Sequence, residues 1–224
     1  MPLFEGEVLL KERLDYINEE IEKAAAVSGR SNKDVCLIAI SKYAAIESMQ
    51  ELYNLGHRDF GEGKLQDLLP KIKVMPQAVK WHFIGRLQSN KVKKVCEQSS
   101  FIHSIDRLEL AEKLSSASSC PKLFLEVNIS HEVSKAGLTI KEWESHFDHI
   151  LNLNLPIIGL MTMAPKNATH DEARLVFGKL KECQNHWIKL GLNLPYLSMG
   201  MSQDYRAAIM EGATHVRIGS ALFK

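Results

Sequence analysis

The chain has 224 residues, of which 45% are hydrophobic and 25% charged, and its formal net charge is +1. This balance argues against nucleic-acid binding, which normally needs a basic surface. No apolar run approaches the length of a membrane span, and residues 1–6 lack the basic-then-apolar pattern of a secretory signal. The four cysteines are widely spaced and predict free thiols in a reducing compartment, the cytoplasm.

An amphipathic helix is expected first, followed by a regular alternation of strands and helices. Leu10, Leu14 and Ile17 recur at helical spacing and predict this helix over Glu7–Val27, on the outside or bottom of the fold. Eight short apolar runs follow, and each is typical of a buried strand in a parallel sheet. The predicted strands span Val35–Ser41, His57–Gly61, Lys80–Gly85, Phe101–Ile105, Lys122–Ile129, Pro156–Met163, Tyr196–Met199 and His215–Gly219.

A helix is expected after each strand. Asp106 is a candidate N-cap for the fourth of these helices, and Thr139 with Glu142 has the spacing of a capping box for the fifth. The predicted helices span Ile46–Leu55, Lys64–Lys73, Ser89–Cys96, Arg107–Ser115, Thr139–Leu151, Asp171–Leu190 and Gln203–Glu211, and a last one begins at Ala221.

Eight strand–helix units predict an α/β fold, a single (β/α)₈ TIM barrel with an extra N-terminal helix. An open doubly wound sheet with the same number of strands is the alternative. No linker rich in Pro, Gly or Ser divides the chain, so we expect one domain over residues 1–224.

Lys42 follows the first predicted strand, where α/β proteins place their ligands. A partly desolvated amine at that position has a lowered pKa and is a nucleophile toward aldehydes. The alternative is a lysine that only marks the strand end and reaches water. The octamer Val35–Lys42 does not decide between the two.

Two turns rich in Gly and Ser follow the seventh and eighth predicted strands. Gly200 would let the backbone approach a ligand, and Ser202 stands where a helix begins. Gly219 and Ser220 repeat this arrangement, at the place where barrels often bind phosphate. Taken alone, each turn is explained by a glycine that the turn requires and a serine that caps the next helix. The two turns together favour a phosphate site.

Charged and polar residues within the strands complete the candidate set. Arg217 lies inside the eighth strand and needs a partner: either an ion pair, with Glu126 or Asp59, or a ligand ring nitrogen at the barrel mouth. A lone histidine in an apolar strand, such as His82, is more often a core residue than a site residue. Lys135 lies in a long loop and could reach the mouth. Ser198 and Met201 lie near the same strand ends and, with His82, are counted as candidate binding residues; no metal ligand is predicted.

The segment Trp81–Lys91, followed by Val95, resembles the signature of the pyridoxal-phosphate homeostasis protein family, the YggS/PROSC-like proteins. The resemblance extends over most of the chain. It includes Ala39–Lys42, Phe60–Glu62, His103–Asp106, Val127–Ser130, Ser134–Leu138, Gly159–Ala164, Leu197–Ser202 and Arg217–Gly219.

This resemblance implies a barrel like that of alanine racemase, as in the fold-type III proteins that bind pyridoxal 5′-phosphate. It implies that the cofactor forms a Schiff base with Lys42. It also implies phosphate binding at Ser202 and at Gly219-Ser220, with Arg217 next to the pyridine nitrogen.

The sequence departs from the family pattern at three places. Tyr43-Ala44-Ala45 stands where the family often has Thr-Lys-Pro, and Gly63 stands where it usually has Asn. Gly63 lacks a side-chain hydrogen bond near the cofactor and could loosen binding or admit water. The sequence ends at Lys224, where the family typically continues with Gly.

The predicted role is a carrier of the cofactor in vitamin B6 homeostasis, and not an enzyme. Arginine stays protonated and cannot share a proton with the ring nitrogen, which leaves the ring a weaker electron sink. The racemase resemblance calls for a second base from another domain, and we expect none here. The alternative is a racemase-like enzyme that pairs Lys42 with His82, Tyr43 or Lys135; another is a barrel that binds a phosphate ligand without a Schiff base. We expect a monomer, with dependent apoenzymes as possible recipients.

Overall fold

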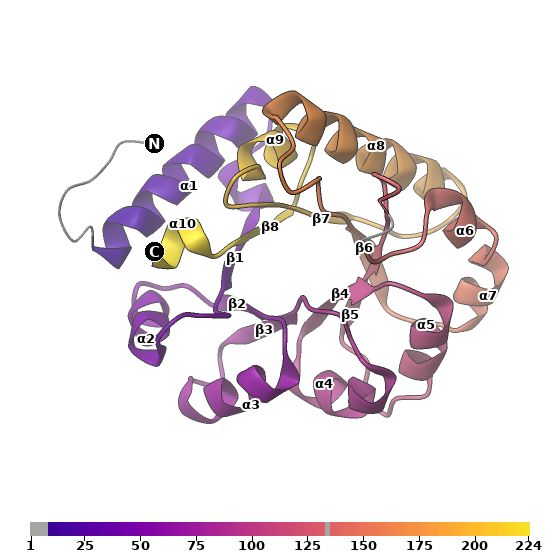
Figure 1. The fold of residues 1–224 in the computed structure, drawn as a ribbon, viewed down its shortest axis with the longest axis horizontal. Helices are drawn as coiled ribbons and strands as arrows, with labels where there is room; N and C mark the ends of the chain where they lie inside the picture. Colours follow the sequence, from indigo (N-terminus) through magenta and orange to yellow (C-terminus); the bar gives the residue numbers. More distant parts are fainter. Residues whose placement is uncertain (1–8, 133–134) are drawn as a thin grey trace.

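Eight parallel strands close into a barrel in the structure, a computed structural model that describes residues 9–132 and 135–224. Each strand pairs with the next, and β1 pairs with β8 (Figure 1). The predicted (β/α)₈ barrel is therefore confirmed, and the open doubly wound sheet is wrong. The strands are β1 (Cys36–Ile40), β2 (Asp59–Glu62), β3 (Lys80–Phe83), β4 (Phe101–Ile105), β5 (Lys122–Glu126), β6 (Ile157–Met161), β7 (Tyr196–Met201) and β8 (His215–Ile218).

Helices surround the barrel on its outside, as Figure 1 shows. The expectations for residues 1–6, for the helix start at Glu7 and for Ser134 lie outside the described residues. The helices are α1 (Leu10–Val27), α2 (Ile46–Asn54), α3 (Leu65–Val74), α4 (Val92–Gln98), α5 (Leu108–Ser115), α6 (Ile140–Glu144), α7 (Phe147–Asn152), α8 (His170–Lys189), α9 (Tyr205–Met210) and α10 (Ser220–Phe223), with short 3₁₀ turns at Asn32–Asp34 and Ser89–Lys91.

Two helix predictions need correction. The single helix expected over Thr139–Leu151 is two helices, α6 and α7, although the capping box of Thr139 and Glu142 is confirmed. Ser145 lies at the break, and its hydroxyl donates to the Glu142 carbonyl oxygen at 2.7 Å, a local bond that competes with helix continuation. Asp106 does not cap α5, because its carboxylate is paired with Arg86 and Arg107 instead.

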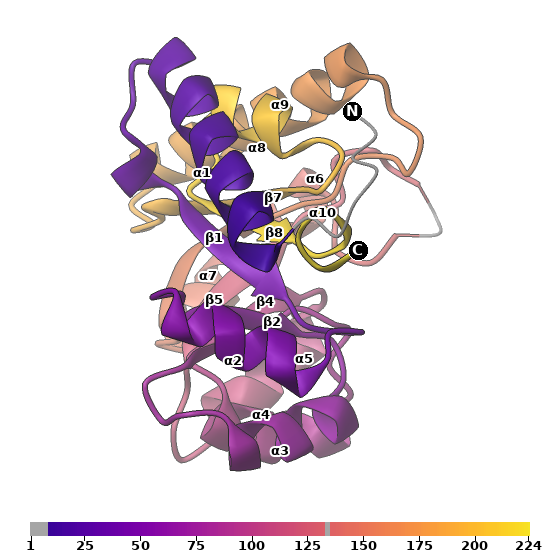
Figure 2. The same cartoon turned by 90° about the vertical axis from the view of Figure 1, so that its left-hand side faces the viewer.

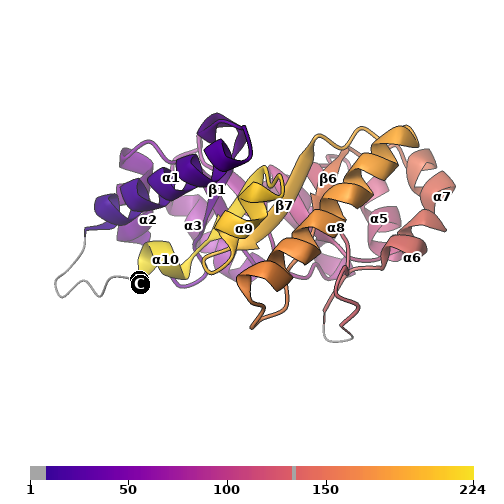
Figure 3. The same cartoon turned by 90° about the horizontal axis from the view of Figure 1, so that it is seen from above.

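Helix α1 closes the ring of helices between α9 and α2. It packs against α9, α10 and α2, and Figures 2 and 3 show it lying along the outside of β1. Helix α10, which follows β8, is only four residues long. The apolar face of α1, including Leu14, Ile17 and Ile21, is buried against this flank. The extra N-terminal helix therefore covers the side of the barrel that the short α10 leaves open.

Alternate residues of each strand face the helices or the barrel interior. On β1, Leu37 and Ala39 belong to the apolar layer under the helices. Ile38 and Ile40 face the interior, where a side chain at Gly61 would collide with both of them. Near the amino ends of the strands the interior is filled with rings: His82 stacks on Phe101, and His103 stacks on Phe124, each with centroids 4.3 Å apart.

Over residues 9–132 and 135–224, no helix is both long and apolar enough to cross a bilayer.

Candidate functional site

The two turns expected to bind phosphate lie side by side at the carboxyl end of the barrel. The Ser202 hydroxyl accepts hydrogen bonds from the amides of Gly219 and Ala221, both at 3.3 Å. Ser220 is exposed at the first position of α10, and Met201 is exposed at the end of β7. The turns after β7 and β8 are thus in direct contact, and the proton of the Ser202 hydroxyl, whose oxygen accepts from both amides, is left to donate to an anion.

Gly200 has a different role from the one expected. Its φ is +92°, and a side chain there would overlap Tyr205 and Ala208 of α9. The glycine is required because α9 packs directly on β7, and not because a ligand approaches the backbone. Gly219, in contrast, lies against Ile40 of β1, two residues before Lys42.

Lys42 lies at the same edge of the mouth and is exposed. The chain turns after Ile40, and the Lys42 side chain extends into solvent with Nζ 4.9 Å from the centroid of the Tyr43 ring. The expected desolvation of this amine is therefore absent in the structure. Ile40, two residues before Lys42, contacts Gly219, so the chain brings an accessible primary amine to the same end of the barrel as the two turns.

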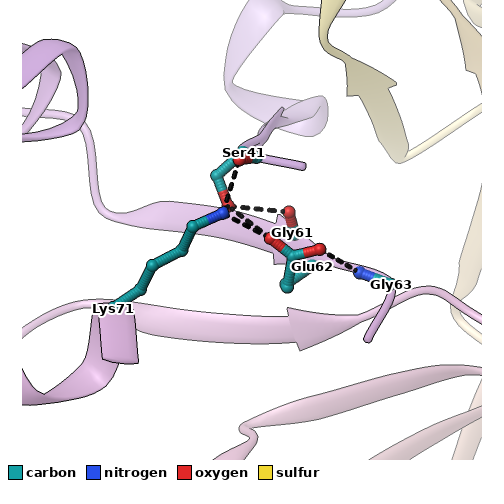
Figure 4. Close-up of polar contacts among 5 residues, drawn as sticks. All are labelled: Ser41, Gly61, Glu62, Gly63 and Lys71. Carbon is teal, nitrogen blue, oxygen red and sulfur yellow. Dashed lines mark hydrogen bonds and ion pairs between the residues drawn. The ribbon is translucent and has the colours of Figure 1, made fainter. Parts of the chain in front are cut away.

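A buried ion pair supports the backbone just before Lys42. The Lys71 ammonium group reaches inward from α3 and contacts both the Ser41 carbonyl oxygen and the Glu62 carboxylate (Figure 4). Glu62 also accepts from the Gly63 amide at 2.8 Å, and the Ser41 hydroxyl donates to the Gly61 carbonyl at 3.1 Å. These contacts tie the carboxyl ends of β1 and β2 together beneath Lys42.

Arg217 is buried inside the barrel below the mouth. Its guanidinium donates to the Ser198 hydroxyl at 2.7 Å and to the Thr162 carbonyl oxygen at 3.1 Å. Within the described residues no carboxylate forms an ion pair with it, so the expected direct pair with Glu126 or Asp59 is absent. Burial lowers the pKa of Arg217 to about 10, against the opposing effect of Glu126 and Asp204.

Ser198 and His82 lie deeper than the other candidates. Ser198 is fully buried and supports Arg217 from below. The His82 side chain is also buried, and its two ring nitrogens bond to Asp59 and His103. Both residues therefore stand behind Arg217 rather than on the surface of the mouth.

Lys135 reaches the carboxyl end of the barrel, where it is anchored just after β6. Its ammonium group donates to the Met163 carbonyl oxygen at 2.9 Å. Two surface hollows lie beside α8, one lined by Cys183 and the other by Leu175, and no candidate residue lines either of them.

A buried carboxyl group on β5 also faces this end of the barrel. Burial raises the pKa of Glu126 to about 7, and the nearby Asp106 acts in the same direction, against Arg217 and Arg86. Neither Glu126 nor Lys71 was among the predicted site residues. The sequence could have indicated both residues, because each is a charged residue at a position where the hydrophobic periodicity predicts a buried side chain.

The comparisons with known proteins identify the family of this chain. The family model described as "Alanine racemase, N-terminal domain" matches residues 14–224. A relative from Aquifex aeolicus named "Pyridoxal phosphate homeostasis protein" is 37% identical over 219 residues, which cover 95% of this chain and 96% of the relative. A protein of the same name from Pseudomonas aeruginosa is 38% identical over 220 residues, covering 96% and 94%.

Solved structures of known proteins also resemble this chain. PipY of Synechococcus elongatus, with PLP bound, has a TM-score of 0.85 and 32% identity, over 96% of this chain and all (100%) of PipY. An alanine racemase from Clostridium difficile has a TM-score of 0.75 at 13% identity, over 95% of this chain and 56% of that enzyme. The racemase likeness concerns the fold alone.

Proposed function

We propose that this chain binds pyridoxal 5′-phosphate and serves in the control and transfer of this cofactor. The chain belongs to the alanine racemase N-terminal domain family and, within it, to the pyridoxal phosphate homeostasis proteins. The observation that carries the proposal is the contact between the turns of Ser202 and Gly219 at the end of the barrel where Ile40 contacts Gly219, two residues before the accessible amine of Lys42. The similarity to PipY, which has been solved with PLP bound, supports the choice of ligand.

The residues at the mouth fit the chemical groups of this cofactor. Ser202, Ser220 and the amides of Gly219 and Ala221 would hold the phosphate, with Met201 at their edge. Arg217 would face the ring nitrogen. Its guanidinium group has five N–H donors, and the described residues supply acceptors for two of them, so the others can donate to a ligand. The cofactor itself supplies an aldehyde that reacts with amines.

Lys42 would hold that aldehyde as a Schiff base. Its amine nitrogen bonds to the aldehyde carbon, and the carbonyl oxygen leaves as water. Because Lys42 is exposed, an amine of a second protein could reach the same carbon and take the cofactor over. Exposure therefore supports transfer to dependent apoenzymes better than it supports catalysis, which needs a water-excluded site.

The competing function is a racemase-like enzyme, which needs a second base beside Lys42. His82 uses both ring nitrogens in the barrel interior, and Lys135 is anchored to the Met163 carbonyl. Tyr43 is the remaining expected base, and its ring neighbours the Lys42 amine. Exchange of the α-proton of an amino acid with solvent deuterium, if abolished in Tyr43→Phe, would favour the enzyme.

We further propose that the protein acts as a monomer in the cytoplasm. The four cysteines are free thiols, which supports a reducing compartment. The molecular mass measured by sedimentation at micromolar concentration tests whether the protein is a monomer.

The direct test of the proposed function is titration of the full chain with pyridoxal 5′-phosphate. We expect near-visible Schiff-base absorbance that stays with the protein after gel filtration. Lys42→Ala should lose this absorbance, whereas Lys93→Ala, which removes an exposed lysine on α4, should keep it. Absorbance that persists in Lys42→Ala would reject Lys42 as the attachment point.

A further inference from the structure

A chain of hydrogen bonds runs through the barrel interior from the amino end of β2 to Arg217. Asp59 Oδ1 lies 3.0 Å from His82 Nε2, and His82 Nδ1 lies 2.9 Å from His103 Nε2. His103 Nδ1 lies 2.8 Å from the Ser198 hydroxyl, which accepts from Arg217 at 2.7 Å. We call this set the relay; its members are Asp59, His82, His103, Ser198 and Arg217.

The two ends of the relay fix the direction of every bond in it. A guanidinium only donates, and an ionised carboxylate only accepts. Ser198 therefore accepts from Arg217 and donates its own proton to His103 Nδ1, and His103 donates from Nε2 to His82. In the reverse direction the Ser198 oxygen would face two donors, and its own proton would lack the His103 acceptor.

The surroundings keep both relay histidines neutral. Burial lowers the pKa of His82 and lowers that of His103 well below its ordinary value. The charged groups that face them are Asp59 on β2, Lys80 on β3 and Arg217 on β8, and the titratable His215 is a further neighbour; of these, only Asp59 favours a protonated ring. The stacked Phe101 and Phe124 hold the two ring planes in place.

The relay is not a route for protons to the mouth. It ends on a guanidinium, which does not give up its proton under ordinary conditions and so cannot pass one on. What it does provide is an oriented row of dipoles between two opposite charges. Arg217 has no carboxylate partner within the described residues, whereas Asp59, at the far end, has its side chain 21% exposed.

We propose that the relay is a positioning device for Arg217. It fixes the guanidinium below the mouth, and the dipoles of the relay hydrogen bonds are aligned with the positive charge of Arg217. In this way the relay sets the strength of the hydrogen bond that Arg217 offers to a ring nitrogen of the ligand. Asp59, His82, His103 and Ser198 are positioning residues that touch no ligand. The part that concerns the ring nitrogen rests on the proposed function. The one-way order of the bonds does not.

Nuclear magnetic resonance of the nitrogen-15-labelled full chain, without ligand, tests the order of the bonds. We expect both relay histidines to be neutral and protonated at Nε2 at pH 7. The proton between the rings should be bonded to His103 Nε2 and should show scalar coupling to His82 Nδ1. A proton bonded to His82 Nδ1, or a doubly protonated His82, would overturn the proposal.

Ligand affinity tests the effect on Arg217. Asp59→Ala should weaken binding of pyridoxal 5′-phosphate severalfold, less than the roughly tenfold effect of one lost hydrogen bond, because Arg217 keeps its bond to the ligand but loses part of the support that positions it. It should leave binding of the 1-deaza analogue, in which carbon replaces the ring nitrogen, unchanged. Asp59→Asn keeps an acceptor oxygen without the charge and should fall between Asp59→Ala and the wild type.

His215 provides the matched control. Its ring lies 6.2 Å from that of His82 in the same layer, but its Nδ1 bonds to the Thr214 hydroxyl, outside the relay. His215→Phe should bind both ligands like the wild type. Equal weakening of the two ligands by Asp59→Ala, or no weakening of either, would overturn the proposed effect on Arg217. Failure of the wild type to bind either ligand would reject the proposed function and leave the resonance result to decide the relay.

Discussion

The Lys71 ammonium group and the Glu62 carboxylate form an ion pair in the protein interior, beneath the residue that precedes Lys42. The Glu62 side chain is 0% exposed and that of Lys71 is 10% exposed. Removal of one partner leaves a buried charge without its counter-charge, which is strongly destabilising. The pair therefore holds the ends of β1 and β2 in register as long as both charges are present.

Lys71→Met should lower the free energy of unfolding by about 3–5 kcal/mol, because the Glu62 carboxylate loses its cation in a dry environment. Urea denaturation measured by circular dichroism gives this value. Lys71→Met combined with Glu62→Gln should recover part of the loss. Lys23→Ala removes an exposed pair with Glu20 and should have little effect; a similarly small effect of Lys71→Met would contradict the account.

Glu126 should make stability depend on pH between about 4.5 and 7, its ordinary and folded pKa values. The folded protein binds this proton more tightly than the unfolded chain, so the contribution is full below pH 4.5 and is lost as the pH rises to 7. Its size is about 3 kcal/mol. The free energy of unfolding of Glu126→Gln, measured across this range, should lack that component.

The comparison must be made as a difference between the wild type and Glu126→Gln. Burial lowers the pKa of His215 to about 3, and this has the opposite sign, because the unfolded chain then binds the proton more tightly. The difference cancels this histidine contribution. If it is constant from pH 4.5 to 7, Glu126 does not titrate as described.

Gly63→Asn should be tolerated and should tighten cofactor binding severalfold, about the effect of one hydrogen bond. A side chain at Gly63 would meet only Gly85, at an ordinary contact distance of 3.8 Å from its Cα. Gly85→Ala is the contrasting variant, because its side chain would overlap the Gly63 carbonyl group. Calorimetric titration with pyridoxal 5′-phosphate measures the first effect and thermal unfolding the second; weaker binding by Gly63→Asn would contradict this prediction.

The sequence predicted the barrel and the neighbouring turns because both follow from local patterns. Apolar runs mark the strands, and parallel strands bring Ser202 and Gly219 to the same end. It did not predict the relay, because its bonds join strands far apart in the chain: His103 and Ser198 are 95 residues apart. The sequence left open whether Lys42 is desolvated or reaches water, since this depends on how the chain turns after Ile40 rather than on composition.

Borohydride reduction of the loaded full chain, followed by peptide mapping, identifies the amine that carries the cofactor. Reduction fixes the cofactor to whichever amine carries it. We expect one pyridoxyl-modified residue, Lys42. A modification at Lys71 or Lys135, or bound cofactor without any modified lysine, would contradict it.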